Sequence, residues 1–283
     1  MSAEPTRPRV VVIAHHDAPL HSEILSRWVE TWGSLAGIVV LHEPRASLWK
    51  RIKRETKRVG LARLADALAF RLYYRLTHAP RDAAWKSQLQ AKLGATLPPV
   101  PTHAPRLDAT SPNTKQAQAF VAQQKPDIVL ALCKQIIAER VFSIPRAGTF
   151  VLHPGICPEY RNAHGCFWAL ANDDLEHVGL TLLRIDRGID TGPVFGYYTA
   201  AFDERNESHI VIQHRVLFDN LTPIATRLLE IHRGTAAPLS TAGRRSGEYG
   251  QPWLTAWWRW KRAAARRGNA PIAPSAPGAR PVP

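Results

Sequence analysis

The sequence predicts an α/β protein in which a doubly wound, mostly parallel β-sheet lies between layers of helices. Short apolar, β-branched runs at Val10–Ala14 and Ile38–Leu41 flank a helical stretch, Ser22–Trp32, which is the order of a β-α-β unit. Both runs are apolar at consecutive positions, as in strands that are buried on both faces between helices. With 45% apolar residues among 283, the chain has enough for a large core.

The elements that follow Leu41 fall into two groups. Residues from about 43 to 108 combine a basic cluster (Lys50, Arg51, Lys53, Arg54, Lys57 and Arg58) with leucines at helical spacing and a Pro-rich end, so we expect a helical insertion there. The alternation of strands and helices then resumes. We expect helices at 113–124, 136–142, 163–172 and 208–232, and strands at 127–132, 149–153, 180–185 and 194–198.

The composition changes after residue 240. Tryptophans alternate with Arg and Lys up to residue 269, and a Pro/Ala-rich stretch follows to residue 283. We therefore expect a main domain at 1–240 that carries the chemistry, a basic Trp-rich extension at 241–269 and a disordered tail at 270–283. The tail has too little apolar surface to order itself.

The cysteine content and the charge indicate the environment and the partners that this protein is expected to have. Three cysteines without a CxxC spacing argue against a disulfide framework and favour a reducing cytoplasm. The longest apolar run is broken by Lys134 and is shorter than the roughly 20 residues of a membrane-spanning helix. The net charge of +14 favours phosphorylated ligands and anionic surfaces.

Two residues stand where an α/β sheet places its chemistry. His153 ends one predicted strand and Asp190 follows another, and ligands of such sheets bind outside the carboxyl ends of the strands. A histidine can move protons near neutral pH, and an aspartate can orient it and stabilise its charge. Alternatively, His153 only closes a strand and Asp190 only opens a tight turn.

The residues around this pair form an ordered set. The set is His153, then Cys157-Pro158-Glu159-Tyr160-Arg161, Trp168-Ala169, Gly179 with Thr181, and Asp190-Thr191-Gly192-Pro193. From about residue 126 to residue 196 this pattern resembles the catalytic domain of the folate-dependent formyltransferase family. That family includes glycinamide ribonucleotide, methionyl-tRNA and nucleotide-sugar N-formyltransferases.

The resemblance implies a Rossmann-like formyltransferase fold and transfer of a formyl group from 10-formyltetrahydrofolate to an amine. His153 and Asp190 would be the catalytic residues, and no metal is expected. The folate would lie against two segments, one with Leu132, Cys133, Lys134 and Ile136, and one with Asp186 and Gly188.

One position departs from the family pattern. The family asparagine two residues before the histidine is Val151 here, and loss of one oxyanion donor costs a rate factor of roughly 10² to 10³. Three explanations remain open. Lys134, Asn162 or His164 replaces the amide, or the protein hydrolyses 10-formyltetrahydrofolate, or it binds folate without catalysis.

For the amine acceptor we expect contacts from His15, Asp17, Arg161, Asn162 and His164. Arg161 could equally brace its loop. The Ala14-His15-His16-Asp17 segment also resembles the zinc motif of PIG-L type deacetylases, but Ala18 and Pro19 stand where that motif has acidic residues. We therefore interpret this segment as a substrate-facing loop or a solvated turn.

The expected acceptor is a small amine, such as an amino sugar on a nucleotide or lipid carrier, because the positive charge favours phosphorylated groups. No RNA-binding module is recognisable, so nucleic acid, including methionyl-tRNA, is the less favoured partner. The basic insertion and the Trp/Arg extension suit peripheral contact with an anionic membrane. A solvated helix whose tryptophans pack on the core explains them as well.

Overall fold

A computed structural model describes residues 7–42, 48–268 and 272, and of residues 48–59 it describes only the backbone. Its main sheet has seven strands in the order β3-β2-β1-β4-β5-β7-β8. The first five along this order run parallel, and β7 and β8 are antiparallel to their neighbours. The strands are β1 (Arg9–His15), β2 (Ser34–Leu41), β3 (Arg106–Ala109), β4 (Ile128–Leu132), β5 (Gly148–His153), β7 (Leu180–Arg184) and β8 (Val194–Tyr198).

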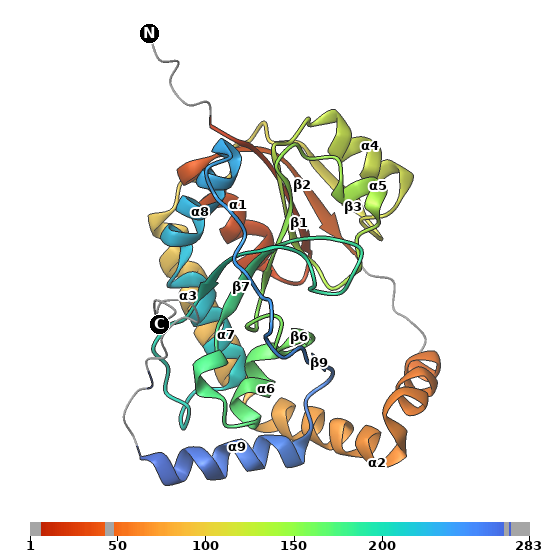
Figure 1. Cartoon of the computed structure of the whole chain (residues 1–283), viewed down its shortest axis with the longest axis vertical. Coiled ribbons are helices and arrows are strands. Elements are labelled where there is room, and N and C mark those ends of the chain that lie inside the picture. Colours follow the sequence, from red (N-terminus) through yellow and green to blue (C-terminus); the bar gives the residue numbers. More distant parts are fainter. Residues whose placement is uncertain (1–6, 43–47, 269–271, 273–283) are drawn as a thin grey trace.

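Helices cover both faces of the sheet, with α4 and α5 on one side and α1 and α8 on the other (Figure 1). Along β1, Val10 and Val12 belong to one apolar cluster, and Val11 and Ile13 belong to the opposite one. Both faces of the strand are therefore buried, as its unbroken apolar run predicted. The helices are α1 (Leu25–Trp32), α2 (Leu48–Thr77), α3 (Ala79–Thr96), α4 (Lys115–Gln123), α5 (Glu139–Phe142), α6 (Gly165–Ala171), α7 (His209–Phe218), α8 (Leu221–Arg233) and α9 (Leu254–Arg267), with a π-helical turn η1 (Leu20–Ile24) and a 3-10 turn η2 (Leu175–His177).

The connectivity confirms the doubly wound class. The chain leaves β1 for β2 and β3 on one side and then returns to β4 and β5 on the other. The order reverses between β1 and β4, which is the place where open α/β sheets form their ligand crevice. The carboxyl ends of β1, β4 and β5 therefore define the edge at which the site is expected.

Two elements differ from the predictions. The sequence did not predict β3, which lies inside the expected insertion, because this edge strand pairs only with β2 and carries exposed Arg106 and Asp108. The single helix expected at 208–232 was wrong, since α7 ends at Phe218 and α8 begins at Leu221. Pro223 lacks the N–H that a continuous helix would need at that point.

The helical insertion is formed by α2 and α3. Within α2, Gly60 has φ 80° and ψ 166°, a conformation that only glycine adopts readily, and the helix changes direction there. Ala67 and Phe70 of α2 are buried against the main domain. The basic cluster predicted at 50–58 lies in α2, but its side chains are outside the described residues.

The Trp-rich extension forms α9, and most of its aromatic surface packs inward. Trp257 and Trp260 are 1% and 0% exposed, whereas Trp258 is 44% exposed. This arrangement agrees with tryptophans packed on the core. Of the tail predicted to be disordered, only Ile272 is among the described residues, and its backbone pairs with Phe202. Across the described ranges, no helix is both long and apolar enough to cross a membrane.

Buried histidines predict acid sensitivity. Burial lowers the pKa of His21 to about 3 and that of His209 well below its usual range, so both stay neutral in the folded protein while the unfolded chain takes up protons below about pH 6.5. The unfolded state then binds more protons, and stability falls as pH falls, by up to about 1.4 kcal/mol per pH unit per histidine. Urea titrations between pH 7.5 and pH 5 measure this slope. It should decrease in His209→Phe, and an unchanged slope would contradict the assignment.

Candidate active site

His153 and Asp190 meet at the carboxyl edge of the sheet. His153 is the last residue of β5 and is 3% exposed, and its Nδ1 lies 3.3 Å from Oδ2 of Asp190. On the other side of the ring, Nε2 lies 2.8 Å from the carbonyl oxygen of Tyr160. A carbonyl oxygen only accepts, so Nε2 carries the hydrogen. The ring is therefore held from both sides.

The backbone around the pair is strained. Asp190, Asn162 and His164 have φ values of 51°, 74° and 59°, in the left-handed region that residues other than glycine rarely occupy. The Asn162 N–H donates to Oδ2 of Asp190 at 2.8 Å, so two of these residues hold each other in place. Strain that the surroundings enforce in this way clusters at functional sites.

Close backbone packing places the loop after β5 against the start of α6. A Cβ on Gly155 would lie 2.7 Å from the Tyr160 carbonyl oxygen and 2.9 Å from Nε2 of His153. A Cβ on Gly165 would lie 2.6 Å from Cα of Gly155. Neither position has room for a side chain, and the two glycines therefore set how deeply the histidine is buried.

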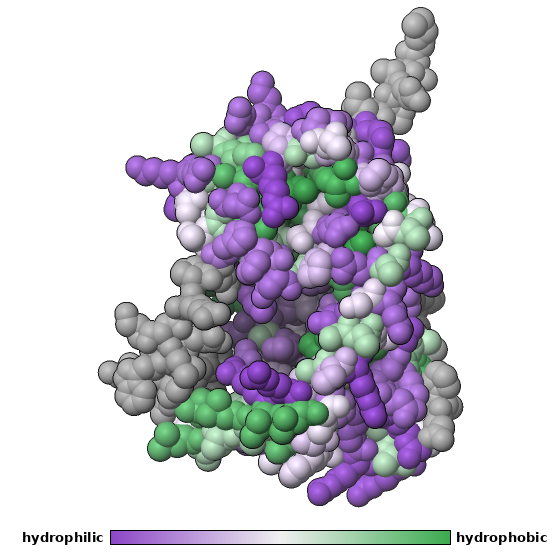
Figure 2. All heavy atoms as spheres, turned by 180° about the vertical axis from the view of Figure 1, so that it is seen from behind, coloured by the Kyte–Doolittle hydropathy of each residue, from purple (hydrophilic) through white to green (hydrophobic). Residues whose placement is uncertain are grey.

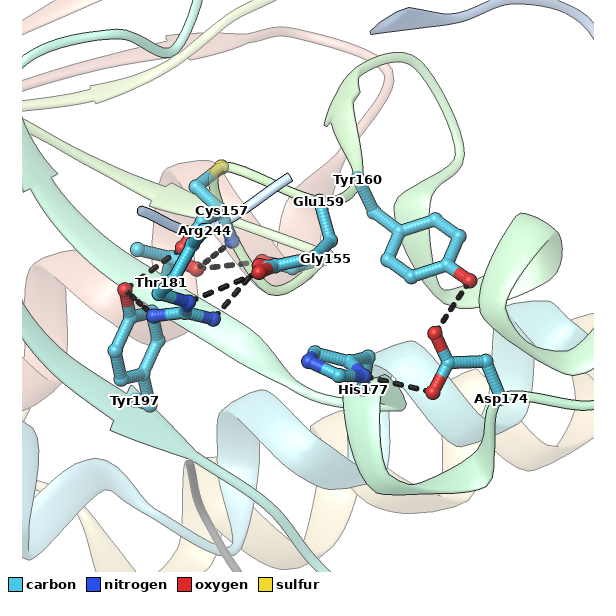
Figure 3. Close-up of polar contacts among 9 residues, drawn as sticks. All are labelled: Gly155, Cys157, Glu159, Tyr160, Asp174, His177, Thr181, Tyr197 and Arg244. Atoms are coloured by element: carbon cyan, nitrogen blue, oxygen red, sulfur yellow. Dashed lines mark hydrogen bonds and ion pairs between the residues drawn. The ribbon is translucent and has the colours of Figure 1, made fainter. Parts of the chain in front are cut away.

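Hydrogen bonds from neighbouring strands fix the same loop (Figure 3). The Thr181 hydroxyl of β7 donates to the Gly155 carbonyl at 2.6 Å and accepts the Cys157 N–H at 2.9 Å. The Tyr197 hydroxyl of β8 donates to the Cys157 carbonyl at 2.7 Å. The peptide bond between Cys157 and Pro158 is cis. Cys157 is 1% exposed, and burial raises the pKa of its thiol, so it serves packing.

The segment after α8 also holds this loop. We call residues 239–253 the strap. Within it, β9 (Glu248–Tyr249) pairs in parallel with β6 (Arg161–Asn162) beside Asp190. Tyr249 stacks between the rings of Tyr160 and Trp168, with centroid distances of 5.1 and 5.4 Å. The boundary drawn at residue 240 therefore divides a segment that contacts the site. Sequence reasoning missed the strap, because its residues carry no motif.

Arg244 of the strap clamps Glu159, and its removal should loosen the loop. Its Nε and Nη2 donate to the two carboxylate oxygens of Glu159 at 2.9 and 2.7 Å (Figure 3). In Arg244→Ala the partly buried Glu159 carboxylate loses both donors, so we expect the free energy of unfolding to fall by about 1.5–3 kcal/mol. Urea unfolding measures the loss. The neighbouring Arg245→Ala is the control, and equal effects of the two substitutions would contradict a specific clamp.

The two segments expected to hold the folate lie next to each other. Cys133 and Ile185 pack against the same apolar cluster, and Arg187 forms an ion pair with Glu139 at 2.9 Å. Leu132 ends β4, and Ile136 beyond it is 71% exposed, an apolar surface free to meet a ligand. In the second segment, Oδ1 of Asp186 accepts the Gly188 N–H and the Thr191 hydroxyl at 2.9 and 2.8 Å. Asp186 thus shapes the loop that presents Asp190.

His15 and Lys134 meet at the same edge. His15 ends β1 and is 8% exposed, and its Nε2 accepts the backbone N–H of Lys134 at 3.1 Å. The Lys134 side chain is exposed, and its charge contributes to lowering the pKa of His164. Asp17 is exposed in the turn after β1.

Arg161 and Asn162 are used mainly to build the loop. Arg161 donates to the Ile189 carbonyl and to the Ser246 hydroxyl, each at 2.9 Å, which is the bracing role considered for it. The Asn162 side-chain amide donates to Glu248 at 3.2 Å. Because that amide already has an acceptor, it is not oriented as a replacement for the missing family asparagine.

His164 lines a pocket next to the strained loop. The pocket has a volume of about 180 Å³ and lies between α2, the start of α6, α7 and the strap, lined by Phe70, Arg71, Tyr74, His164, His209, Ile210, Gln251 and Pro252. Burial, with the charges of Lys134 and Arg71, lowers the pKa of His164 to about 4. The pKa of His209 is lowered too, so at neutral pH the pocket is lined by two uncharged histidines, aromatic rings and one cation.

Val151 packs with apolar neighbours. It lies one strand position from Leu152 and pairs with Ala131 of β4 and Leu183 of β7, and it contacts the cluster of Cys157, Leu183 and Val194. An apolar side chain at this point supplies no hydrogen-bond donor. Within the described part of the chain, no group of three or more His, Cys, Asp or Glu residues could hold a metal ion.

Comparisons with known proteins point to one family. Residues 81–220 match the family model described as formyl transferase. A methionyl-tRNA formyltransferase from Thermotoga maritima is 27% identical over 165 residues, which are 52% of this chain and 52% of that protein. One from Sorangium cellulosum is 35% identical over 104 residues, 35% of this chain and 33% of that protein. The chain thus spans about half the length, or less, of these curated relatives.

Solved structures share the fold. A sugar N-formyltransferase from a Shewanella species aligns with a TM-score of 0.51 at 12% identity, covering 86% of this chain and 76% of that one. A phosphoribosylglycinamide formyltransferase from Anaplasma phagocytophilum gives 0.51 at 11% identity, covering 87% and 100%. The matched segment, residues 81–220, contains both His153 and Asp190, and through it the chain matches the formyl transferase family.

Proposed function

We propose that this protein transfers a formyl group from 10-formyltetrahydrofolate to a primary amine. The observation that supports this most strongly is the approach of His153 and Asp190, residues 37 positions apart in the sequence, to 3.3 Å at the carboxyl edge of β5. The family match spans both residues. The pair lies near the point where the strand order reverses, as expected for a ligand site.

In the proposed reaction the amine nitrogen attacks the formyl carbon, and a tetrahedral intermediate with a negatively charged oxygen forms. The bond from that carbon to N10 of the folate then breaks, N10 gains a proton and the amine loses one. His153, oriented by Asp190, would turn its Nε2–H from the Tyr160 carbonyl to the developing oxyanion. Such preorganised stabilisation of an oxyanion usually contributes most of the rate enhancement in acyl transfer. Asp190 would keep the ring oriented.

Lys134 is the residue we propose to compensate for Val151. Its side chain is exposed at the carboxyl edge of β4, and its charge helps to lower the pKa of His164. An ammonium group at this edge supplies a donor for the oxyanion without an amide on β5. Asn162 is less suitable, because its amide is bound to Glu248.

We further propose that the acceptor is small and carries an anionic group, as an amino sugar on a phosphorylated carrier does. The pocket beside His164 has about 180 Å³, roughly the room for one sugar ring, and aromatic side chains suit the apolar face of such a ring. Arg71 would meet the anionic group. The sequence relatives named methionyl-tRNA formyltransferase favour the alternative acceptor, methionyl-tRNA.

The test is to incubate the protein with 10-formyltetrahydrofolate and a panel of amines, and to identify formylated products by mass spectrometry. The panel contains amino-sugar nucleotides, glycinamide ribonucleotide and methionyl-tRNA. We expect product from an amino-sugar nucleotide. Product from methionyl-tRNA or glycinamide ribonucleotide alone would overturn the acceptor assignment and leave formyl transfer intact. Folate turnover without any product would show a hydrolase.

If the pocket holds the acceptor, its residues should govern the KM for the acceptor and not that for the folate. We expect His164→Ala and Arg71→Ala each to raise the acceptor KM by about 10-fold or more, the effect of about 1.4 kcal/mol of lost binding. Steady-state kinetics with each substrate varied separately checks this. Arg75→Ala, exposed one turn further along α2, is the control. A rise in the folate KM instead would place the pocket on the other substrate.

A further inference from the structure

An apolar stripe on α2 points away from the core. Leu61, Leu68, Leu72 and Leu76 are 75%, 43%, 61% and 71% exposed. Their positions, seven, four and four residues apart, put them on one face of the helix. We call these residues the leucine stripe. Figure 2 shows apolar residues gathered over this part of α2 at the lower edge of the molecule.

The stripe does not stabilise the fold. The opposite face of α2 carries Ala67 and Phe70, which are 7% and 4% exposed, and packs on the main domain. The ring of Phe70 lies 5.6 Å from that of Phe167 and 5.7 Å from that of Trp257. This buried face anchors the helix on the main domain, and the four leucines face the solvent. A row of large apolar side chains in water is unfavourable and marks an interaction surface.

Positive charge accompanies the stripe. Arg75 lies between Leu72 and Leu76 in the sequence and is exposed. The sequence of the first part of α2 contains six Lys and Arg residues between positions 50 and 58, and the whole chain has a net charge of +14. The kink at Gly60 separates those six residues from the stripe, but Arg75 lies on the same straight segment as the leucines, and basic residues beside an apolar stripe are typical of helices that lie in the interface of an anionic membrane.

We propose that α2 binds the surface of an anionic lipid bilayer through the leucine stripe. The leucines would enter the boundary between headgroups and acyl chains, and Arg75 beside them would meet the lipid phosphates. A second copy of this chain is the less suitable occupant, since two such helices would bring the same positive charges together. The proposal does not depend on the formyl transfer proposed above, because binding to vesicles is measured without turnover.

The experiment is sedimentation of the full-length protein with vesicles made of equal parts phosphatidylglycerol and phosphatidylcholine, and with vesicles of phosphatidylcholine alone. We expect binding to the anionic vesicles, weakened by added salt, and much less binding to the neutral ones. In the double variant Leu68→Glu/Leu72→Glu the partition onto anionic vesicles should fall by at least about tenfold, because two leucines that would be buried in the bilayer are replaced by charged residues. The control is Leu239→Glu, which changes a 39% exposed leucine at the start of the strap, paired with Val194 of β8, and should bind as wild type does.

Circular dichroism and thermal unfolding of both variants show that they fold. The proposal is overturned if wild type does not sediment with anionic vesicles, or if the double variant sediments as well as wild type does. It is also overturned if wild type forms a concentration-dependent dimer that the double variant loses, with no vesicle binding, since the stripe would then join two copies. Equal binding to neutral vesicles would remove the role of charge and contradict the choice of an anionic surface.

Discussion

His153→Gln lowers kcat for formyl transfer by about 10² to 10³-fold, the range expected when one group that stabilises the oxyanion is removed. Glutamine can still donate to the Tyr160 carbonyl, so the loop keeps its hydrogen bond, but it has no imidazole ring to hold a proton beside Asp190, which lies 3.3 Å from the histidine in wild type. Because the loss concerns the transition state, KM for either substrate should change little. Steady-state kinetics of the purified variant measures both constants.

A second histidine–aspartate pair provides the control. His177 and Asp174 are 2.7 Å apart, and Asp174 accepts the hydroxyl of Tyr160 at 2.8 Å (Figure 3). His177→Gln removes a partly buried imidazole from a carboxylate partner in the same way, without touching Asp190. We expect it to keep nearly all activity. If His177→Gln reduced kcat as much as His153→Gln, the effect would be structural, and the catalytic role of His153 would be refuted.

Trp260→Ala lowers the free energy of unfolding by about 3–5 kcal/mol, the usual cost of deleting a buried tryptophan. Trp260 is 0% exposed and packs edge to face on Trp257, with the ring centroids 4.9 Å apart. The Lys261 ammonium lies 3.9 Å from the centre of the Trp260 ring. Its indole N–H has no hydrogen-bond partner among the described residues, so the cost comes from apolar contacts and the cavity that remains. Urea unfolding monitored by far-UV circular dichroism measures it.

Trp258→Ala on the same helix is the matched control. Its side chain is 44% exposed, and we expect a change of no more than about 1 kcal/mol. Similar small effects of both substitutions would mean that α9 is not docked on the core in solution. In that case the tryptophans of the extension would be free for other contacts.

The sequence predicted the parts of the fold that depend on short apolar runs. β1, β2, β4 and β5 are buried on both faces, and each appears in the sequence as consecutive apolar residues. β3 has no such apolar run, because it is a short edge strand with exposed charges, and only its pairing with β2 defines it. The break between α7 and α8 was readable from Pro223, but the apolar residues on both sides of it favoured one continuous helix.

The sequence also predicted the central pair of the site. The two residues do lie 3.3 Å apart, but the rule about strand ends does not explain it: β7 runs antiparallel to β5, so its carboxyl end lies beside Phe150, and the loop after Arg184 brings Asp190 back to His153. The strap could not be predicted in this way, because Arg244 reaches Glu159 across 85 residues of sequence and no rule of spacing links them. Such tertiary contacts leave no periodic signal.

The same limit explains the roles expected for Arg161 and Asn162. Both lie beside Asp190, but the hydrogen bonds of their side chains go to Ser246, Ile189 and Glu248 of the protein itself. The identity of a residue does not show whether its donors are spent on its own loop. Their contact with the acceptor therefore stays a prediction.

The fate of the formyl carbon tests the proposed function most directly. The protein is incubated with tetrahydrofolate that carries a ¹³C-labelled formyl group at N10, together with the acceptor found in the amine panel, and the carbon is followed by NMR. We predict that the label moves into a formamide in wild type and stays on the folate in His153→Gln. Label that accumulates as free formate, or transfer that proceeds unchanged in His153→Gln, would contradict formyl transfer at the His153–Asp190 pair.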